Sequence, residues 1–265
     1  MSENQIVILG AGNVASNLAF AFHKAGIKKL HIHNRTENSA KQLAEKLDCT
    51  YSSDFENIPT NADLYLIAVK DDAIQELCEN QTVKKKIENN LSVHTAGSVD
   101  IKILKQLSSN YGVFYPLQTF SKHKILNFKT IPICIEASSG FNYNKLRKFA
   151  LEISEDVRNI NSEQRKYIHL AAVFANNFTN RILTFAEEIL AEKDIDFNIL
   201  YPLIEETLNK IKNESPAKIQ TGPAARNDKT VLNLHLELLK DKPELQKIYD
   251  SISKNILKLK YDKNR

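Results

Sequence analysis

Residues 6–15 read Ile-Val-Ile-Leu-Gly-Ala-Gly-Asn-Val-Ala, and this stretch decides the fold of the N-terminal half. An apolar strand runs into a Gly-x-Gly-x-x-Ala turn, and a helical pattern follows at once. Gly10 permits the tight turn, Gly12 leaves room for a pyrophosphate at the helix N-terminus, and Ala15 lets helix and strand pack closely. Because the motif opens a strand–helix–strand unit, it indicates a dinucleotide site more than a merely structural turn. The cofactor ligands predicted here are Gly10, Gly12, Asn13 and Val14.

The end of the second predicted strand, at Asn34-Arg35-Thr36, narrows the choice of dinucleotide. An NAD enzyme places Asp or Glu near this point to bind the ribose 2′-hydroxyl, and no carboxylate is present at these three positions. Arg35 is suited to pair with a 2′-phosphate, and Thr36 can add a hydrogen bond. A solvated Arg35 beside a helix capped by Thr36 is the alternative. The pattern favours NADP (NADPH), with Asn34, Arg35 and Thr36 as cofactor ligands.

Composition excludes several other classes of protein. The 265 residues are 42% hydrophobic, enough for one large domain or two modest ones, and the net charge of +4 is spread along the chain. We therefore expect no nucleic-acid partner and no membrane partner, since no apolar stretch approaches spanning length and no signal peptide is evident. Three cysteines without paired spacing predict free thiols and a cytoplasmic, reducing location. No Cys/His cluster has metal-ligand spacing, so no metal is expected.

Two halves of different character divide the chain. Up to about residue 160 short apolar strands alternate with helices, which predicts an α/β domain with a doubly wound, mostly parallel sheet. From Ser162 onward the strand signal is lost, which predicts an all-helical part. We expect a Rossmann NADP-binding domain over 1–160 and a helical substrate and dimerisation domain over 161–265. The predicted strands are 5–9, 29–34, 49–51, 63–69, 91–95, 112–116, 131–136 and 157–160.

Two further strand ends are expected at the edge where such sheets bind ligands. The fourth strand closes at Val69, a predicted cofactor contact, and Asp71 or Asp72 is most simply the N-cap of the next helix. After the fifth strand, Gly97 would let the backbone approach a nicotinamide. His94 beside it is either a substrate contact or an ordinary buried histidine.

A polar stripe marks the otherwise apolar segment 167–180 of the helical half. His169, Asn176 and Asn180 are seven and eleven positions apart, which places them on one face of an α-helix. The surrounding residues are nearly all apolar, so the helix is expected to be buried. Buried polar groups need partners, supplied either by neighbouring helices or by a ligand in an interdomain cleft, which we favour.

Two polar segments beside prolines, 115–120 and 220–226, are typical of preorganised loops that line a site. Ordinary turn chemistry explains the Gly-Pro part of the second segment equally well. Arg226 is the natural candidate to bind a substrate carboxylate, although an exposed surface arginine is the alternative. The predicted substrate ligands are Gln118, Thr119, Asn180, Gln220, Thr221 and Arg226.

Taken together these motifs resemble the Rossmann-like NADP oxidoreductases of the deazaflavin-coenzyme-dependent type joined to a C-terminal domain of unknown function. The resemblance covers essentially the whole chain and implies a homodimer with a helical domain similar to those of 6-phosphogluconate dehydrogenase and pyrroline-5-carboxylate reductase. The wider superfamily includes hydroxyacid dehydrogenases, which carry a catalytic Lys four residues before an Asn on the equivalent long helix. Here the residues four positions before Asn176 and Asn177 are Ala172 and Val173, which argues against the hydroxyacid dehydrogenase mechanism. The segments that carry the resemblance are GAGNVA (10–15), NRT (34–36), AVKDDAI (68–74), HTAGS (94–98), YPLQTF (115–120), HLAAVFANNFTN (169–180), PLIEET (202–207) and QTGPAAR (220–226).

Two hypotheses about function follow. The first is an oxidoreductase that moves a hydride between NADPH and a small carbonyl, imine or deazaflavin acceptor. His169 is then the first choice for proton donor and His94 the second, with Asn176 orienting the substrate. The second is a non-catalytic NADP-binding sensor or regulatory protein. In either case the long apolar helix predicts a symmetric dimer.

Overall fold

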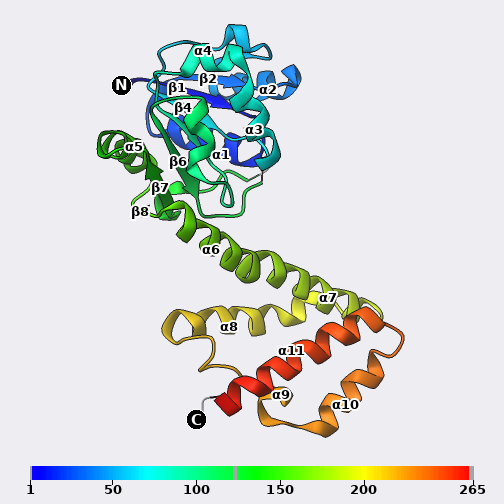
Figure 1. Cartoon of the computed structure of the whole chain (residues 1–265). Coiled ribbons are helices and arrows are strands. Elements are labelled where there is room, and N and C mark those ends of the chain that lie inside the picture. The colour runs from blue at the N-terminus through cyan, green and yellow to red at the C-terminus, as the bar shows by residue number, and fades with distance from the viewer. Residues whose placement is uncertain (1, 122–123, 263–265) are drawn as a thin grey trace. The chain divides into compact units, whose positions relative to one another are not determined.

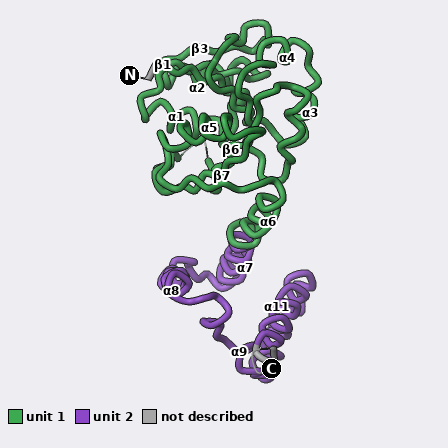
Figure 2. Tube along the Cα trace, turned by 60° about the vertical axis from the view of Figure 1, so that its left-hand side comes forward, with its two compact units in different colours: residues 1–177 green, residues 178–265 purple. Residues whose placement is uncertain are grey.

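The computed structural model describes residues 2–121 and 124–262 and divides into two compact units, residues 1–177 and 178–265 (Figure 2). Unit 1 contains an eight-stranded sheet with the order β3-β2-β1-β4-β5-β6-β7-β8. Figure 1 shows labelled strands of this sheet among the helices of unit 1. The strands are β1 (Ser2–Leu9), β2 (Ile27–His33), β3 (Thr50–Ser52), β4 (Leu64–Ile67), β5 (Ser92–His94), β6 (Tyr111–Pro116), β7 (Ile133–Ala137) and β8 (Val157–Asn159).

All eight predicted strands are therefore present, and the predicted Rossmann fold is confirmed. From β3 to β6 every neighbouring pair is parallel, whereas β7 pairs antiparallel with β6 and parallel with β8. The carboxyl ends of the first six strands consequently share one edge of the sheet, with β1 and β4 adjacent at the point where the strand order reverses.

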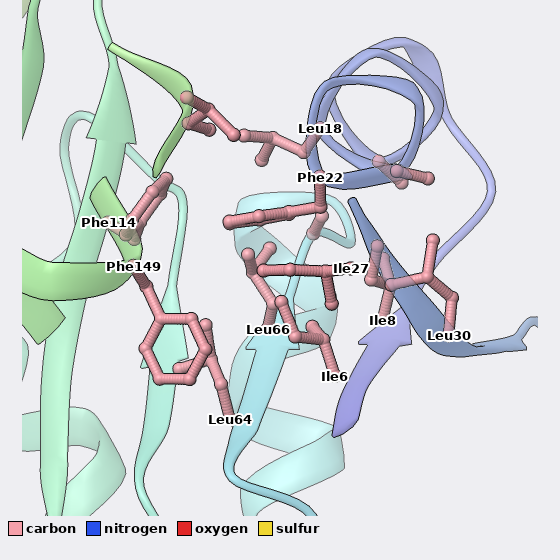
Figure 3. Close-up of a cluster of buried hydrophobic side chains, with 14 of the residues drawn as sticks. Ile6, Ile8, Leu18, Phe22, Ile27, Leu30, Leu64, Leu66, Phe114 and Phe149 are labelled. Atoms are coloured by element: carbon pink, nitrogen blue, oxygen red, sulfur yellow. The ribbon is translucent and has the colours of Figure 1, made fainter. Parts of the chain in front are cut away.

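Helices cover both faces of this sheet because β1 is apolar on both faces. Ile6 and Ile8 pack with the core formed under α1 (Asn13–Lys24), α2 (Glu37–Leu47) and α5 (Gly140–Ile153), which Figure 3 shows around Phe22 and Phe114. Val7 and Leu9 pack on the opposite face. That face is covered by α3 (Asp71–Glu79), α4 (Gln81–Ile87) and the 3₁₀ helix η2 (Ile101–Gln106). Two shorter 3₁₀ turns, η1 (Phe55–Asn57) and η3 (Phe128–Thr130), complete the unit's connections.

A long helical stretch begins at Ser162, where the sequence predicted the helical part to begin. It consists of α6 (Ser162–Ala172), the π-helix η4 (Val173–Phe178) and α7 (Thr179–Ala191), and the boundary between the compact units falls inside η4. The division of function at residue 160 stays a prediction. Unit 2 continues with η5 (Phe197–Leu200), α8 (Tyr201–Asn213), α9 (Pro223–Arg226), α10 (Lys229–Leu238) and α11 (Pro243–Asp262).

The expectation that the helix around 167–180 is buried is wrong for the single chain. Only Ser162 and Arg165 of α6 are buried, and no residue of η4 or α7 is. Large apolar side chains recur every three or four positions and are exposed, among them Tyr167, Leu170, Phe174, Phe178 and Ile182. Within the described part of unit 2, only Ala224 and Leu239 are buried. The apolar pattern thus marks a surface of this chain.

Candidate functional site

The first cleft of unit 1 lies at the carboxyl ends of β1, β2 and β4 and has a volume of about 370 Å³. It brings together five of the predicted cofactor ligands, which are Gly10, Gly12, Asn34, Arg35 and Val69. Thr36 is not part of its lining; it occupies the N-cap position of α2, but its hydroxyl makes no capping bond. The glycine turn and the end of β2, which the sequence predicts to bind one cofactor, thus line the same cleft, and their role as cofactor ligands stays a prediction.

The two glycines of the turn have different physical roles. Gly10 has φ +125°, and a Cβ there would lie 2.4 Å from the Ala68 carbonyl oxygen. Position 10 therefore requires glycine, because the backbone has a positive φ there and the Ala68 carbonyl, just after β4, lies close. At Gly12 a Cβ would meet nothing within 4 Å, and this residue is the N-cap of α1 without any side-chain cap. Gly12 leaves the amide groups of the α1 N-terminus open to an anion.

Basic and aromatic groups line the rest of this cleft. The exposed Arg35 shares it with Lys70, while Asn34 donates a hydrogen bond through Nδ2 to the Thr36 carbonyl at 3.0 Å. His33 is stacked on Phe55, with ring centroids 4.4 Å apart. These residues surround the turn at Gly10–Gly12, called the phosphate turn below, with the cationic and flat surfaces that a phosphorylated nucleoside requires.

His33 and Phe55 were missed by the reasoning from sequence, although period-two alternation places His31 and His33 on one face of β2. Both imidazoles bond to the Ser52 hydroxyl, at 2.9 and 3.1 Å, and His31 also bonds to Thr50. Burial lowers the pKa of His31 and of His33 to about 4. The two side chains are therefore neutral at physiological pH, and positive charge in this cleft comes from Arg35 and Lys70.

A second cleft of about 680 Å³ is lined by the start of α1, the segment after β6, and the last part of α6 with η4. It brings together six of the predicted residues from three distant stretches of sequence, which are Asn13, Val14, Gln118, Thr119, His169 and Asn176. Among the described residues that line it there is no Asp, Glu, Lys or Arg. Asn13 and Val14 belong to the helix that begins at the phosphate turn, so the second cleft adjoins the dinucleotide-binding motif.

A tyrosine–histidine pair lies in the wall of the second cleft. The Tyr115 hydroxyl is 3.1 Å from His169 Nδ1, and the rings meet edge to face. Burial raises the pKa of Tyr115 to about 12, so its hydroxyl keeps its proton at neutral pH. Because Tyr115 occupies Nδ1, Nε2 is the ring nitrogen left for a ligand. Tyr115 belongs to the segment 115–120 that the sequence predicts to line a site, but only Gln118 and Thr119 of that segment were named as ligands.

Gly97 and His94, two predicted site residues at or after the end of β5, lie beside the clefts and not in their lining. Gly97 is buried, and a Cβ there would lie 2.5 Å from His169 Nδ1. This glycine therefore makes room for the His169 ring, and its predicted contact with a nicotinamide stays a prediction. His94 is fully buried, with Nδ1 accepting a hydrogen bond from the Ala96 amide, and burial lowers its pKa to about 3. Neither Gly97 nor His94 lines either cleft.

Local helix geometry also departs from two expectations. Lys70, and neither Asp71 nor Asp72, is the N-cap of α3, and the Asp71 carboxylate accepts a hydrogen bond from the Ser98 hydroxyl. Val173–Phe178 form a π-helix where a regular α-helix was predicted. Its wider turn places Asn177 as well as Asn176 in the lining of the second cleft. Such π segments are frequent at functional sites.

The remaining predicted substrate ligands belong to unit 2. Asn180, Gln220, Thr221 and Arg226 are all exposed there, and their predicted role in substrate binding stays a prediction. Among the described residues, no group of three or more His, Cys, Asp or Glu side chains is placed to hold a metal. Across the same residues, every helix is too short or too polar to cross a bilayer.

Fold and clefts together define a Rossmann dinucleotide-binding protein that continues into a helical C-terminal part. Residues 1–108 match the family model for shikimate/quinate 5-dehydrogenase, and residues 131–256 match that of a domain of unknown function, DUF2520. The chain is 42% identical to the "putative NADP oxidoreductase BF3122" of Bacteroides fragilis, with a TM-score of 0.90 and coverage of 96% of this chain and 98% of that one. The protein belongs to that family of NADP oxidoreductases.

More distant proteins share the fold. Protein TM1727 of Thermotoga maritima is 20% identical with a TM-score of 0.79, over 97% of this chain and 99% of that one. An imine reductase from Myxococcus stipitatus, solved with NADP+, is 14% identical with a TM-score of 0.67, over 95% and 92% of the chains. The NADP(+) shikimate dehydrogenase of Pyrobaculum aerophilum is 36% identical over 74 residues, which are 28% of this chain. That match spans about a quarter of the dehydrogenase (26%).

The contrast between the two turn glycines gives a matched pair of variants. Gly10→Ala is expected to lower the free energy of unfolding by about 2 kcal/mol or more, because the methyl group meets the Ala68 carbonyl at a positive φ. Gly12→Ala should leave stability unchanged and weaken NADPH binding at least about tenfold, which corresponds to about 1.4 kcal/mol. Urea unfolding and NADPH titration measure both quantities. Equal stability of the two variants would contradict the role given to Gly10.

Proposed function

We propose that this NADP-dependent oxidoreductase reduces a small imine or carbonyl compound in the second cleft, with His169 as the proton donor. The His169–Tyr115 pair carries the proposal, because a substrate bond that gains a hydride also needs a proton at its nitrogen or oxygen. The pair lies in a cleft that adjoins the dinucleotide helix, and its Nε2 is not occupied by Tyr115. When bound, NADPH supplies the hydride.

Residues of the first cleft fit this cofactor. Gly12 offers an open cradle at the uncapped N-terminus of α1, which suits a pyrophosphate. Arg35 is exposed, forms no ion pair within the described residues, and lies in the same cleft. We infer that Arg35 pairs with the 2′-phosphate and that Lys70 adds a second positive charge.

Proton transfer follows from the hydrogen bond between the two rings. When His169 is protonated, its Nδ1–H is donated to the Tyr115 oxygen, and the proton on Nε2 is the one available to a substrate. His169 gives up that proton as the substrate nitrogen or oxygen gains an electron pair. The Nδ1–H···O bond to Tyr115 persists after the transfer, so the ring keeps its orientation. Imidazole suits this role because one ring nitrogen can release a proton while the other keeps its N–H donated to Tyr115.

Uncharged hydrogen-bonding groups define the substrate we expect. Asn176 orients the reacting nitrogen or oxygen, while Gln118 and Thr119 contact the remainder of the molecule through hydrogen bonds. The fold is shared with an imine reductase and with pyrroline-5-carboxylate reductases, which makes small cyclic imines the first compounds to test. A deazaflavin acceptor stays the other candidate, because apolar side chains, among them Phe120 and Ile168, also line this cleft.

Assembly as a homodimer is the second part of the proposal. The exposed apolar positions of α6, η4 and α7 form a continuous row with helical spacing, and unit 2 has few buried residues of its own. Exposed apolar rows of this length are typical of obligate interfaces. We infer that a second copy of the chain covers them. A cytoplasmic location fits the three free cysteines, Cys49, Cys78 and Cys134.

A non-catalytic NADP sensor is the alternative hypothesis. It accounts for the first cleft but not for an imidazole held by a tyrosine in a separate, uncharged cleft. Cofactor binding does not distinguish the two functions, whereas turnover does. Absence of NADPH oxidation with a broad panel of small imines and carbonyls would favour the sensor.

Arg35 is expected to set the preference for NADPH. Wild-type protein should bind NADPH about tenfold to a hundredfold more tightly than NADH, because only NADPH offers a 2′-phosphate for a charge-assisted pair worth about 1.5–3 kcal/mol. Arg35→Ala should abolish the difference by weakening NADPH alone. Arg158→Ala, at an exposed arginine of β8, is the matched control. Titration of both nucleotides measures the effect, and equal wild-type affinities would contradict it.

His169→Gln is expected to lower turnover by about 10²–10⁴-fold while leaving the Kd for NADPH nearly unchanged, because the proton donor is removed without touching the first cleft. Tyr115→Phe should produce a smaller loss of turnover, since the His169 ring loses its hydrogen-bond partner at Nδ1 but keeps the Nε2 proton that it donates. Steady-state kinetics with the best imine and NADPH titration measure the two effects. A His169→Gln variant with full turnover would overturn the assignment.

The proposed homodimer predicts the mass of the protein in solution. Sedimentation at micromolar concentration is expected to give twice the chain mass of 30.1 kDa. Ile182→Lys places a charge in the apolar row of α7 and should shift the protein toward monomer, because a buried charge is costly. Phe141→Lys on α5, where the side chain is 79% exposed and outside the row, should leave the mass unchanged. A monomeric wild-type protein would exclude the homodimer.

A further inference from the structure

A buried arginine anchors the start of α6. The Arg165 side chain has no exposed surface, and its Nη1 donates to Glu136 Oε2 at 2.8 Å. Its Nη2 donates to the Val99 carbonyl and to the Ser162 hydroxyl, while Nε has no hydrogen-bond partner. Burying a guanidinium is costly even when it is paired, so its presence here calls for a reason beyond stability.

This cluster joins three separate pieces of unit 1. Glu136 belongs to β7, Arg165 and Ser162 belong to α6, and Val99 lies in the segment after β5. Ser162 donates to Glu136 Oε2 at 2.7 Å and accepts a hydrogen bond from the Ile101 amide at 3.0 Å. Each member bonds to at least one other element. The cluster therefore fixes the position of the first turn of α6 relative to β7 and to the segment after β5.

His169 is one helical turn beyond Arg165, at position i+4 on the same face. The segment that binds Arg165 at Val99 also carries Gly97, against which His169 packs so closely that a Cβ there would lie 2.5 Å from Nδ1. Since Ser162 and Arg165 are the only buried residues of α6, little apolar packing restrains this helix in the single chain. The buried polar cluster therefore restrains where His169 lies, together with the direct contacts of His169 with Tyr115 and Gly97.

We propose that Arg165 is a positioning residue for His169, which it holds against Tyr115 and Gly97 through the rigid first turn of α6. The inference rests on the proposed role of His169 as proton donor. Arg165 itself lines neither cleft, so it acts through the helix and makes no contact with substrate or cofactor. A displacement of about 1 Å at a catalytic group lowers turnover by roughly a hundredfold.

Arg165→Lys tests this because it keeps the charge and loses the planar fork. The variant is expected to lower kcat by about tenfold to a hundredfold, with the KM and the Kd for NADPH unchanged. In a His169→Gln background, Arg165→Lys should have no further effect on kcat, since the two changes act on one step. Arg158→Lys, at the exposed pair with Asp156, is the matched control and should have no effect.

Glu136→Gln is the second variant, for use if Arg165→Lys does not fold, and it should lower kcat in the same way. A substrate-free measurement accompanies both: the backbone amide resonance of Gly97, against which the His169 ring lies, should shift in these variants and not in Arg158→Lys. Full wild-type turnover by His169→Gln would contradict the proposed function. Loss of turnover in His169→Gln but not in either cluster variant, or an unmoved Gly97 resonance, would overturn the role of Arg165 alone.

Discussion

Parallel pairing of the strands is the constraint on which the rest of unit 1 depends. Because β1 to β6 all run in one direction, their carboxyl ends meet at one edge of the sheet. The phosphate turn after β1, the cationic end of β2 and the tyrosine at the end of β6 reach that edge from distant stretches of sequence. At the centre of this edge, the absence of a side chain at Gly10 allows the Ala68 carbonyl to lie close to the turn after β1. Both clefts follow from this arrangement.

The long helix has two different kinds of surface, one at its first turn and one along its later turns. Its first turn is fixed by buried polar contacts around Arg165, whereas its later turns present a row of exposed apolar side chains. Polar contacts are directional, so they set the position of His169 closely. Apolar contacts depend mainly on area and tolerate small shifts. The proposed proton donor therefore lies next to the polar cluster, and the proposed dimer interface lies along the exposed apolar row.

Much of the fold and part of the site could be predicted from the sequence because their signals are local. Alternating apolar strands, the glycine turn and the charge at the end of β2 are each readable within about ten residues. The polar stripe led to His169 and Asn176, which do share a cleft. The same reasoning gave a wrong environment for that helix, since periodicity shows which face is apolar and not what covers it. Lys70, where Asp71 or Asp72 was expected, is the N-cap of α3, and Asp71 accepts a hydrogen bond from Ser98, which is distant in the sequence.

The sequence by itself determined the order of the strands along the chain, the phosphate turn and the preference for a 2′-phosphate, because each rests on backbone conformation or charge at adjacent positions. Only the tertiary structure decided which side chains meet across long separations: Tyr115 with His169, Gly97 with the same ring, and Arg165 with Glu136. These contacts depend on strand order, on the angle at which α6 leaves the sheet and on the wider turn of η4. None of these is encoded in a short window, since each is set by how distant elements pack together.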